Sequence, residues 1–269
     1  MSNIRLIISD IDGTILTSHH QVDEQLIEVM PELEKAKIPF VLASARSPLG
    51  MQPIAHKLGL PENPIACYNG ALVLEGNRTI IEHPVDKTEI QELLSYLSTD
   101  YPSVSVNIYS GKNWITNQLD KWSQLEAGIT GESPILKELQ ETVSDSEAPI
   151  HMLLLIDAAK VILALPQNRL SRDYPQTAFY LSKDNYLEVT AKHVSKEHAL
   201  LEVAKYYDIP LEQVMTIGDN FNDSPMLALA GLGIAMGNAP EGVKETANLV
   251  TASNDDHGVA QAITEHVLN

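Results

Sequence analysis

The sequence Arg5-Leu-Ile-Ile-Ser-Asp-Ile-Asp-Gly-Thr14 combines a short apolar run with two acidic residues. An apolar run of this length is typical of a buried parallel strand. Asp10 and Asp12 come directly after it, and Gly13 permits a sharp turn. The stretch predicts a strand that delivers two carboxylates to its carboxyl end. The alternative interpretation is a plain turn whose aspartate caps a following helix.

Strand-like and helix-like patterns alternate at both ends of the chain. Further short apolar runs occupy residues 39–43, 64–68, 214–217, 231–235 and 248–251. Helical spacing of apolar residues covers residues 22–33, 48–58, 200–207 and 259–267. This alternation predicts a doubly wound parallel sheet, which binds ligands beyond the carboxyl ends of its strands. Asn69-Gly70 lies between two apolar runs and predicts a hairpin.

The middle of the chain has a different pattern. Helical spacing at 88–97 is followed by alternation at 104–116, a polar acidic stretch at 132–149, and strand-like runs at 151–156 and 161–165. We expect residues 85–185 to form an inserted α+β domain. The main domain would then consist of residues 1–84 and 186–269, with both ends of the chain contributing strands to one sheet.

Composition excludes several classes of protein. The 269 residues include 18 Lys+Arg and 36 Asp+Glu, a net charge of −18, and at about 150 residues per domain they make one large domain or two moderate ones. A surface of this charge repels nucleic acids and anionic membranes, although a local basic pocket could still hold one small anion. The 44% of hydrophobic residues is enough for a packed core.

The sequence also bears on the expected compartment. Cys67 is the single cysteine, so no intrachain disulfide is possible and a reducing compartment fits. The first residues lack the pattern of a signal peptide, and no apolar run approaches the about 20 residues of a membrane span. We therefore expect a soluble cytoplasmic protein without a membrane or nucleic-acid partner.

The acidic pair after the first strand is suited to phosphate chemistry. Two close carboxylates repel each other and favour a bound cation or a shared proton. Oxygen ligands with open water positions suit Mg²⁺. One carboxylate can then attack phosphorus while the other moves protons.

A second acidic cluster, Gly218-Asp-Asn-Phe-Asn-Asp223, follows the apolar run at 214–217. Asp219 and Asp223 provide two further carboxylates. By itself this segment could be an Asx-turn in which Asp223 caps the next helix. Because two acidic clusters at strand ends of one parallel sheet can converge, the pair of segments predicts one metal site.

Two further segments could bind phosphate. Ser44-Ala-Arg46 follows the second strand, where a hydroxyl and backbone amides can surround phosphate oxygens, although Ser44 could instead be a helix cap. Lys196 begins a helix, where a cation opposes the helix dipole. This unfavourable position suggests that Lys196 screens the nucleophile and holds phosphate. The alternative is a solvated lysine paired with a nearby glutamate.

Other candidates are weaker. Cys67 is interpreted as a small buried hydrophobic residue. Tyr109 and Trp114 could line a substrate pocket, but core packing is the preferred interpretation. The nine histidines show no zinc-binding spacing.

These segments, in this order, resemble the four motifs of the haloacid dehalogenase-like superfamily of phosphatases. The segments 10–14, 44–46 and 218–223 look like the first, second and fourth motifs, and Lys196 looks like the third. The stretch Ile234-Ala-Met-Gly-Asn-Ala239 and the Asn69-Gly70-Ala71 turn look like the Cof-like branch. The middle of the chain matches only by position and length, as the α/β cap inserted between the second and third motifs.

The resemblance implies a Rossmann-like core with an inserted α+β cap, and a Mg²⁺-dependent phosphatase acting through an aspartyl phosphate on sugar phosphates or similar small metabolites. It implies that Asp10 is the nucleophile and a metal ligand, and that Asp12 is the general acid–base, with its carbonyl on the metal. Asp219 would bind the metal directly, and Asp223 would support it. The phosphoryl group would contact Ser44, Lys196, Asn222 and the backbone amides of Ile11 and Ala45.

The sequence departs from the family pattern at two positions. Ala45 replaces the usual glycine of the second motif, and Glu197 follows Lys196 where glycine is common. The motifs leave open a sugar phosphomutase, a non-catalytic sugar-phosphate sensor and a receiver-type phospho-acceptor domain. The expected partner is a small phosphorylated metabolite, and the expected state is a monomer or small homo-oligomer.

Overall fold

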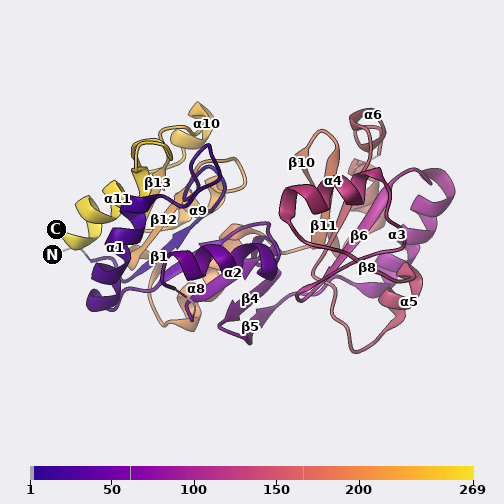
Figure 1. Cartoon of the computed structure of the whole chain (residues 1–269), viewed down its shortest axis with the longest axis horizontal. Coiled ribbons are helices and arrows are strands. Elements are labelled where there is room, and N and C mark those ends of the chain that lie inside the picture. Colours follow the sequence, from indigo (N-terminus) through magenta and orange to yellow (C-terminus); the bar gives the residue numbers. More distant parts are fainter. Residues whose placement is uncertain (1–2, 61, 166) are drawn as a thin grey trace. The chain divides into compact units, whose positions relative to one another are not determined.

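The computed structural model describes residues 3–60, 62–165 and 167–269. The chain divides into two compact units (Figure 1). The core unit comprises Met1–Arg46, Met51–Ile81 and Ser195–Asn269, and the inserted unit comprises Ser47–Gly50 and Glu82–Val194. The predicted fold class, an α/β core with an α+β insertion, is confirmed.

The core unit is built on an eight-stranded sheet in the order β14-β13-β12-β1-β2-β3-β4-β5. Its strands are β1 (Leu6–Ser9), β2 (Phe40–Ala43), β3 (Pro64–Cys67), β4 (Leu72–Glu75), β5 (Arg78–Glu82), β12 (Val214–Gly218), β13 (Leu232–Ala235) and β14 (Leu249–Val250). The pairs from β14 to β3 are parallel, and β4 is antiparallel to β3, as the predicted hairpin requires. Both ends of the chain therefore supply the sheet.

Helices cover the sheet of the core unit. They are α1 (Glu24–Ala36), α2 (Pro48–Lys57), α8 (Lys196–Tyr206), α9 (Ser224–Leu229), α10 (Glu241–Lys244) and α11 (Gly258–Ile263), which continues into a π-helical turn at Thr264–Leu268. Leu6 and Ile8 of β1 pack with residues of α8 and α9, while Ile7 between them is also fully buried. Burial of both faces explains why Leu6, Ile7 and Ile8 form a continuous apolar run rather than an alternating one.

The register of the sheet aligns the ends of β1 and β12. Ser9 lies opposite Ile217, and the Asp10 amide donates to the Ile217 carbonyl at 2.9 Å. The residues that follow the two strands, Asp10 and Asp219, therefore emerge at the same edge of the sheet.

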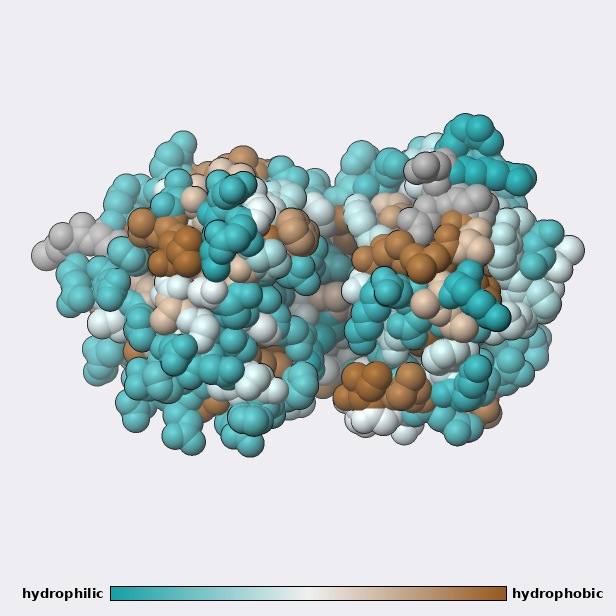
Figure 2. All heavy atoms as spheres, turned by 90° about the horizontal axis from the view of Figure 1, so that it is seen from above, coloured by the Kyte–Doolittle hydropathy of each residue, from teal (hydrophilic) through white to brown (hydrophobic). Residues whose placement is uncertain are grey.

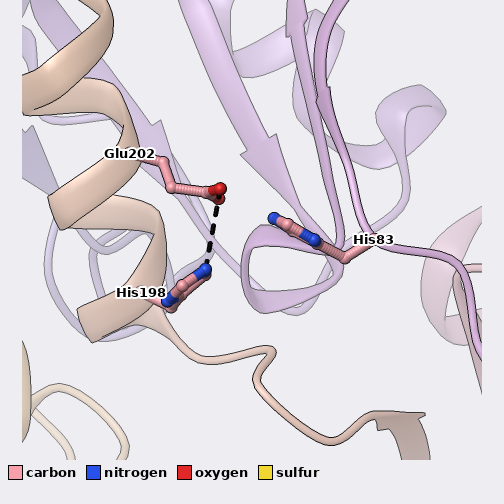
Figure 3. A group of neighbouring side chains, drawn as sticks. All are labelled: His83, His198 and Glu202. Atoms are coloured by element: carbon pink, nitrogen blue, oxygen red, sulfur yellow. Dashed lines mark ion pairs between the residues drawn. The ribbon is translucent and has the colours of Figure 1, made fainter.

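Lys196 is the first residue of α8, and the start of this helix is fixed by Ser195. The Ser195 hydroxyl accepts a hydrogen bond from the His198 amide at 3.0 Å, which caps the helix. One turn further along, His198 Nε2 lies 3.6 Å from Glu202 Oε1 on the same helix (Figure 3).

The inserted unit contains a six-stranded sheet in the order β10-β11-β9-β6-β7-β8. Its strands are β6 (Ser105–Ser110), β7 (Asn113–Thr116), β8 (Ile135–Leu136), β9 (Met152–Ile156), β10 (Thr177–Lys183) and β11 (Tyr186–Ala191). Its helices are α3 (Lys87–Asp100), α4 (Lys121–Thr130), α5 (Leu139–Ser144), α6 (Ala159–Ile162) and α7 (Gln167–Asp173). The apolar face of the sheet packs with α3, α5, α6 and α7.

Two details of the inserted unit differ from the sequence prediction. The strand expected at 161–165 is wrong, because α6 covers Ala159–Ile162 and Ile162 and Leu165 point into the core. A short apolar run does not distinguish a strand from a buried helical turn. The predicted boundary at 185/186 falls before β11, and β11 pairs with β9 and β10 in the inserted unit.

The aromatic pair of the inserted unit is part of its core. Tyr109 and Trp114 are both buried, and their rings stack with centroids 6.0 Å apart. The Trp114 indole donates to Asn107 Oδ1 at 3.0 Å, so its polar atom is satisfied. Core packing, the preferred interpretation of these two residues, is confirmed.

The face of the molecule drawn in Figure 2 is mainly hydrophilic, with hydrophobic groups scattered over it. Across the described part of the chain, no helix combines the length and the apolar character that a membrane crossing requires.

Candidate active site

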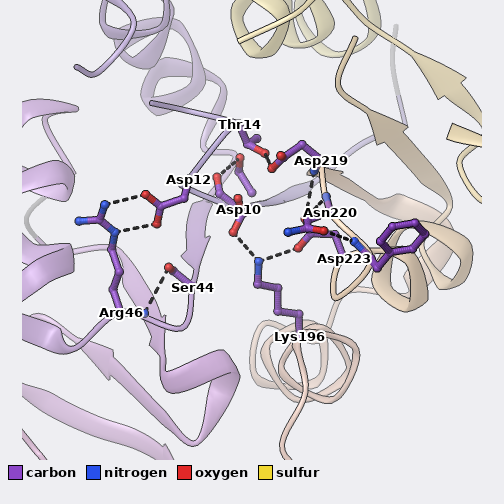
Figure 4. A network of polar contacts seen from close by, with 11 residues as sticks. Asp10, Asp12, Thr14, Ser44, Arg46, Lys196, Asp219, Asn220 and Asp223 are labelled. Atoms are coloured by element: carbon purple, nitrogen blue, oxygen red, sulfur yellow. Dashed lines mark hydrogen bonds and ion pairs between the residues drawn. The ribbon is translucent and has the colours of Figure 1, made fainter. Parts of the chain in front are cut away.

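Acidic side chains gather where β1 and β12 end (Figure 4). Asp10 follows β1, and Asp219 and Asp223 lie in the loop after β12. Carboxylate oxygens of these three residues all lie within 4.8 Å of one another. The structure therefore brings together the two acidic clusters that the sequence placed at separate strand ends.

Lys196 is the cation of this cluster. Its ammonium group contacts Asp10 Oδ1 and lies 2.6 Å from Asp223 Oδ1. Lys196 is only 3% exposed, and Asp10 and Asp223 are both buried. The interpretation of Lys196 as a solvated surface lysine is wrong.

Asp223 organises the loop between β12 and α9. Its side chain is fully buried, and Oδ2 accepts hydrogen bonds from the amides of Asp219 at 3.0 Å and Asn220 at 2.9 Å. A Cβ on Gly218 would lie 2.5 Å from the Asp223 Cβ, so this approach requires glycine. Asp223 precedes α9, but its side chain makes no capping hydrogen bond to that helix. The helix-cap interpretation is therefore replaced by a role in shaping the loop.

Thr14 and Gly13 fix the position of Asp219. The Thr14 hydroxyl donates to Asp219 Oδ1 at 2.9 Å. Gly13 has a φ of +81°, and a Cβ there would lie 2.4 Å from Asp219 Oδ2. The turn after β1 thus depends on glycine for its backbone conformation and for the space that Asp219 occupies.

Without a bound cation, the three carboxylates of the cluster carry more negative charge than Lys196 can neutralise. Burial, together with the charges of Asp223 and Asp219, raises the pKa of Asp10, although Lys196 opposes the shift. Burial also raises the pKa of Asp219. The two carboxylates beside Lys196 outweigh the effect of burial and raise the pKa of its ammonium group. One lysine does not neutralise three carboxylates.

The donor set fits a hard divalent cation. Asp10, Asp219 and Asp223 offer only oxygen atoms, the ligands that Mg²⁺ prefers. Burial is the main cause of the raised pKa values of Asp10 and Asp219, with neighbouring carboxylates adding to it, and a divalent cation would favour the ionised forms of both groups. The residues present therefore suit Mg²⁺, as the sequence predicts.

Asp12 points away from this cluster. Its carboxylate accepts two hydrogen bonds from Arg46, at 2.7 Å from Nε and 2.6 Å from Nη2 (Figure 4). Asp12 follows β1 and Arg46 follows β2, the neighbouring strand. The general acid–base predicted by the resemblance is thus held by an arginine to which the sequence analysis gave no role.

The candidate phosphate-binding groups lie at the same strand ends. Ser44, which is 3% exposed, directly follows β2, and its hydroxyl accepts from the Arg46 amide at 3.3 Å. Ala45 is half-buried next to it, and Ile11 is fully buried after β1. The Asn222 side chain is exposed on the loop after β12. Their contacts with phosphate stay predictions.

The fold and the site define a class of hydrolase in which an aspartate at the end of a central parallel strand is paired with a buried lysine. The match to a family model over residues 7–263 is in keeping with this, and the chain belongs to the haloacid dehalogenase-like hydrolases. The predictions of the family and of a phosphatase are confirmed.

Relatives and solved structures of this family match along nearly the whole chain. Phosphatase YwpJ of Bacillus subtilis is 29% identical over 98% of this chain and 100% of its own. The 5-amino-6-(5-phospho-D-ribitylamino)uracil phosphatase YcsE of B. subtilis is 28% identical over 99% and 97%. The crystal structure of a haloacid dehalogenase-like hydrolase from Bacteroides thetaiotaomicron superimposes with a TM-score of 0.87 at 27% identity, covering 97% of this chain and 99% of that one.

Proposed function

We propose that this phosphatase hydrolyses phosphate monoesters with Mg²⁺ and passes through a phosphoaspartate at Asp10. The observation that carries the proposal is the buried contact of Lys196 with both Asp10 and Asp223 at the carboxyl edge of the sheet. A buried lysine between carboxylates at a ligand-binding edge is suited to holding an anion beside a nucleophile.

The first half of the reaction transfers the phosphoryl group to the protein. Lys196 contacts Asp10 Oδ1, so we assign the attack on phosphorus to Oδ2. A new bond forms between this oxygen and phosphorus while the bond from phosphorus to the leaving oxygen breaks. Asp12 gives its proton to that oxygen, which leaves as an alcohol.

The second half releases phosphate. A water molecule attacks phosphorus, and Asp12 takes the proton of this water. The bond between phosphorus and Asp10 breaks, and inorganic phosphate leaves. The carboxylate of Asp10 and the proton on Asp12 are both restored, so the cycle consumes one ester and one water.

Charge stabilisation comes from the groups around Asp10. Asp10 and Asp219, with the Asp12 carbonyl, are the groups we assign to Mg²⁺, and Asp223 supports this site; when bound, the ion would supply positive charge to the phosphoryl transfer. Lys196 supplies a second positive charge and holds Asp10 in place. Ser44, Asn222 and the amides of Ile11 and Ala45 are assigned to the remaining phosphoryl oxygens.

We infer that the substrate is a sugar phosphate or a similar small phosphorylated metabolite. The name of YcsE, which specifies a phosphorylated ribityl compound, supports this class. A domain organisation of core and substrate-selecting cap, a monomeric or small homo-oligomeric state and a cytoplasmic location stay predictions from the sequence.

The test is phosphate release from a panel of sugar phosphates, nucleotides, pyridoxal phosphate and flavin mononucleotide, with Mg²⁺ or with EDTA. Asp10→Asn removes the nucleophile, and Asp184→Asn changes an exposed aspartate in the inserted unit as a matched control. We expect release that needs Mg²⁺, is lost in Asp10→Asn and is unchanged in Asp184→Asn. Reaction with a radiolabelled phosphate ester should label the wild-type protein at Asp10.

Two results would overturn the proposal. Undiminished turnover by a folded Asp10→Asn protein would exclude the phosphoaspartate. Transfer of phosphate to a second sugar, seen with a bisphosphate activator in place of release to water, would indicate a phosphomutase.

A further inference from the structure

Arg46 donates one hydrogen bond to each carboxylate oxygen of Asp12. Nε lies 2.7 Å from Oδ2, and Nη2 lies 2.6 Å from Oδ1. In Figure 4 the Asp12 carboxylate points toward Arg46, whereas the Asp10 carboxylate points toward Lys196. Two parallel hydrogen bonds fix the plane of a carboxylate as well as its position.

The backbone positions both residues of this pair at the ends of neighbouring strands. Asp12 and Arg46 follow neighbouring parallel strands whose register is fixed by pairs such as Ile8 opposite Val41. The Arg46 carbonyl accepts from the amide of Tyr68, a fully buried residue, at 3.1 Å, and the Arg46 amide donates to Ser44 Oγ at 3.3 Å. Both sides of the Arg46 backbone are therefore held, and the guanidinium is directed at Asp12.

The pair also remains open to exchange. The Asp12 side chain is 49% exposed and that of Arg46 is 34% exposed. Because water reaches both side chains, a ligand can compete for one of the two hydrogen bonds. The two hydrogen bonds therefore orient the Asp12 carboxylate, yet one of them can be exchanged for a ligand.

We propose that Arg46 is the positioning residue of the acid–base group. The inference rests on the proposed function, in which Asp12 passes a proton to the leaving oxygen and takes one from water. Two N–H donors of Arg46 face the two oxygens of Asp12, so both oxygens act as acceptors in this pair. To carry the proton, Asp12 turns one oxygen out of the grip, because an O–H and an N–H cannot point at each other. Arg46 holds the other oxygen and limits that turn.

This arrangement predicts which step depends on Arg46. Departure of an alkoxide needs a proton from Asp12, whereas departure of an activated aryl oxide does not. The ratio kcat/KM covers the steps up to the departure of the leaving group, so it isolates the transfer to Asp10 from the later hydrolysis. Removal of Arg46 should therefore lower kcat/KM more for an alkyl phosphate than for an aryl phosphate.

The experiment compares Arg46→Gln, Arg46→Lys and the control Arg78→Gln, which removes an exposed arginine paired with Glu75. Each protein is assayed with 2,4-dinitrophenyl phosphate and with the sugar phosphate that the wild type hydrolyses best. Because loose placement of a reacting group can reduce rates by about 100-fold, we expect Arg46→Gln to lose roughly 10-fold to 100-fold in kcat/KM on the sugar phosphate. The loss on the aryl phosphate should be several times smaller.

Arg46→Lys keeps the charge but not the two-point grip, so it should shift the ratio of the two substrates in the same direction. Thermal unfolding checks that every variant is folded. Arg46→Gln is measured both in the wild-type protein and in the Asp12→Asn variant, to show whether Arg46 affects the rate through Asp12. In the Asp12→Asn background, Arg46→Gln should cause no further loss, because its action passes through Asp12.

Equal losses on the two substrates, or a full additional loss in the Asp12→Asn background, would overturn the proposal and indicate direct contact of Arg46 with phosphate. Unaltered kinetics in Arg46→Gln would overturn it as well. Failure of the proposed function is distinguishable, since the wild-type protein would then release no phosphate with Mg²⁺ from either substrate.

Discussion

Gly13 and Asp219 approach each other so closely that a Cβ on Gly13 would lie 2.4 Å from Asp219 Oδ2. The two residues are far apart in sequence but lie at adjacent strand ends, where the turn after β1 meets the loop after β12. The space normally filled by a side chain is here occupied by a carboxylate of the candidate metal site. Glycine at position 13 is thus a requirement of the site as well as of the turn.

Gly13→Ala should therefore abolish most activity, because the added methyl group displaces Asp219. Gly59→Ala is the matched control, since Gly59 also has a positive φ, of +73°, but no atom lies within 4 Å of its Cβ position. Gly59→Ala should lose about 1–2 kcal/mol of stability from the strained backbone, and Gly13→Ala should lose more because Asp219 must also move. Phosphate release and the dependence of the melting temperature on Mg²⁺ should be lost in Gly13→Ala alone. Equal activity of the two variants would contradict the displacement of Asp219.

Lys196→Met should destabilise the protein strongly when Mg²⁺ is absent. The substitution leaves Asp10 and Asp223 buried without their cation, and breaking a buried ion pair costs about 3–5 kcal/mol. Excess Mg²⁺ should restore part of the melting temperature, because it offsets the same charge, but it should not restore turnover. Lys192→Met, which changes an exposed lysine just before α8, is the control. Equal melting temperatures of the two variants in EDTA would show that the buried pair is unimportant for stability.

Thr14→Val should weaken Mg²⁺ binding with little effect on the fold. Valine keeps the shape of the buried threonine but removes the hydrogen bond to Asp219 Oδ1 at 2.9 Å. Loss of a hydrogen bond that orients a metal ligand typically reduces metal affinity by about 10-fold or more. The Mg²⁺ concentration for half-maximal rate should rise by roughly this factor. Thr14→Ser retains the hydroxyl and should behave like the wild type, and an unchanged half-maximal concentration in Thr14→Val would contradict the role of this hydrogen bond.

The sequence was sufficient to predict the convergence of the catalytic groups. Parallel strands that end at one edge bring the residues after them together, so Asp10 and Asp219 could be placed side by side without a structure. The position of Lys196 at a helix start, where the dipole disfavours a cation, was a second physical signal. Both inferences depend on backbone geometry, which local sequence patterns report well.

Side-chain partners across the sheet could not be predicted in the same way. Nothing in the spacing of Thr14 or Arg46 indicates that one donates to Asp219 and the other to Asp12. These contacts depend on side-chain directions at the ends of three different strands. Each residue does belong to a segment that resembles a family motif, Thr14 to 10–14 and Arg46 to 44–46, and this was the available signal.

The inserted unit was less predictable for a related reason. The strand β10 has a mixed burial pattern with an exposed second half, so it lacks the regular alternation that identifies a strand. The strand β8 is two exposed residues within a polar, acidic stretch. Such elements form because a neighbouring strand offers hydrogen bonds, β11 for the first and β7 for the second. The residues of β8 and β10 therefore show little of the sequence pattern that predicts a strand.

His151 is expected to make the stability of the protein fall in mild acid. The side chain is 1% exposed, Nδ1 accepts from the Gly111 amide at 3.0 Å, and Nε2 lies 3.1 Å from Glu82 Oε1. Burial lowers the pKa of His151 below its ordinary value of 6.5, although Glu82 opposes the shift. Protonation would also place an N–H against the Gly111 donor. The folded state therefore resists a proton that the unfolded state accepts.

The direction in which stability changes with pH follows from this difference in proton binding between the folded and unfolded states. Well above pH 6.5 both states carry a neutral imidazole and the stabilisation is complete. As the pH falls below that value the unfolded state binds the proton first, and stability decreases by at most about 1.4 kcal/mol per pH unit until the folded pKa is reached. Urea unfolding at pH 7.5, 6.5 and 5.5 measures the slope, with about 0.1 M salt held constant. His151→Asn should reduce the slope, whereas His193→Asn, at an exposed position, should not. The same slope in the wild type and in His151→Asn would assign the acid sensitivity to other groups.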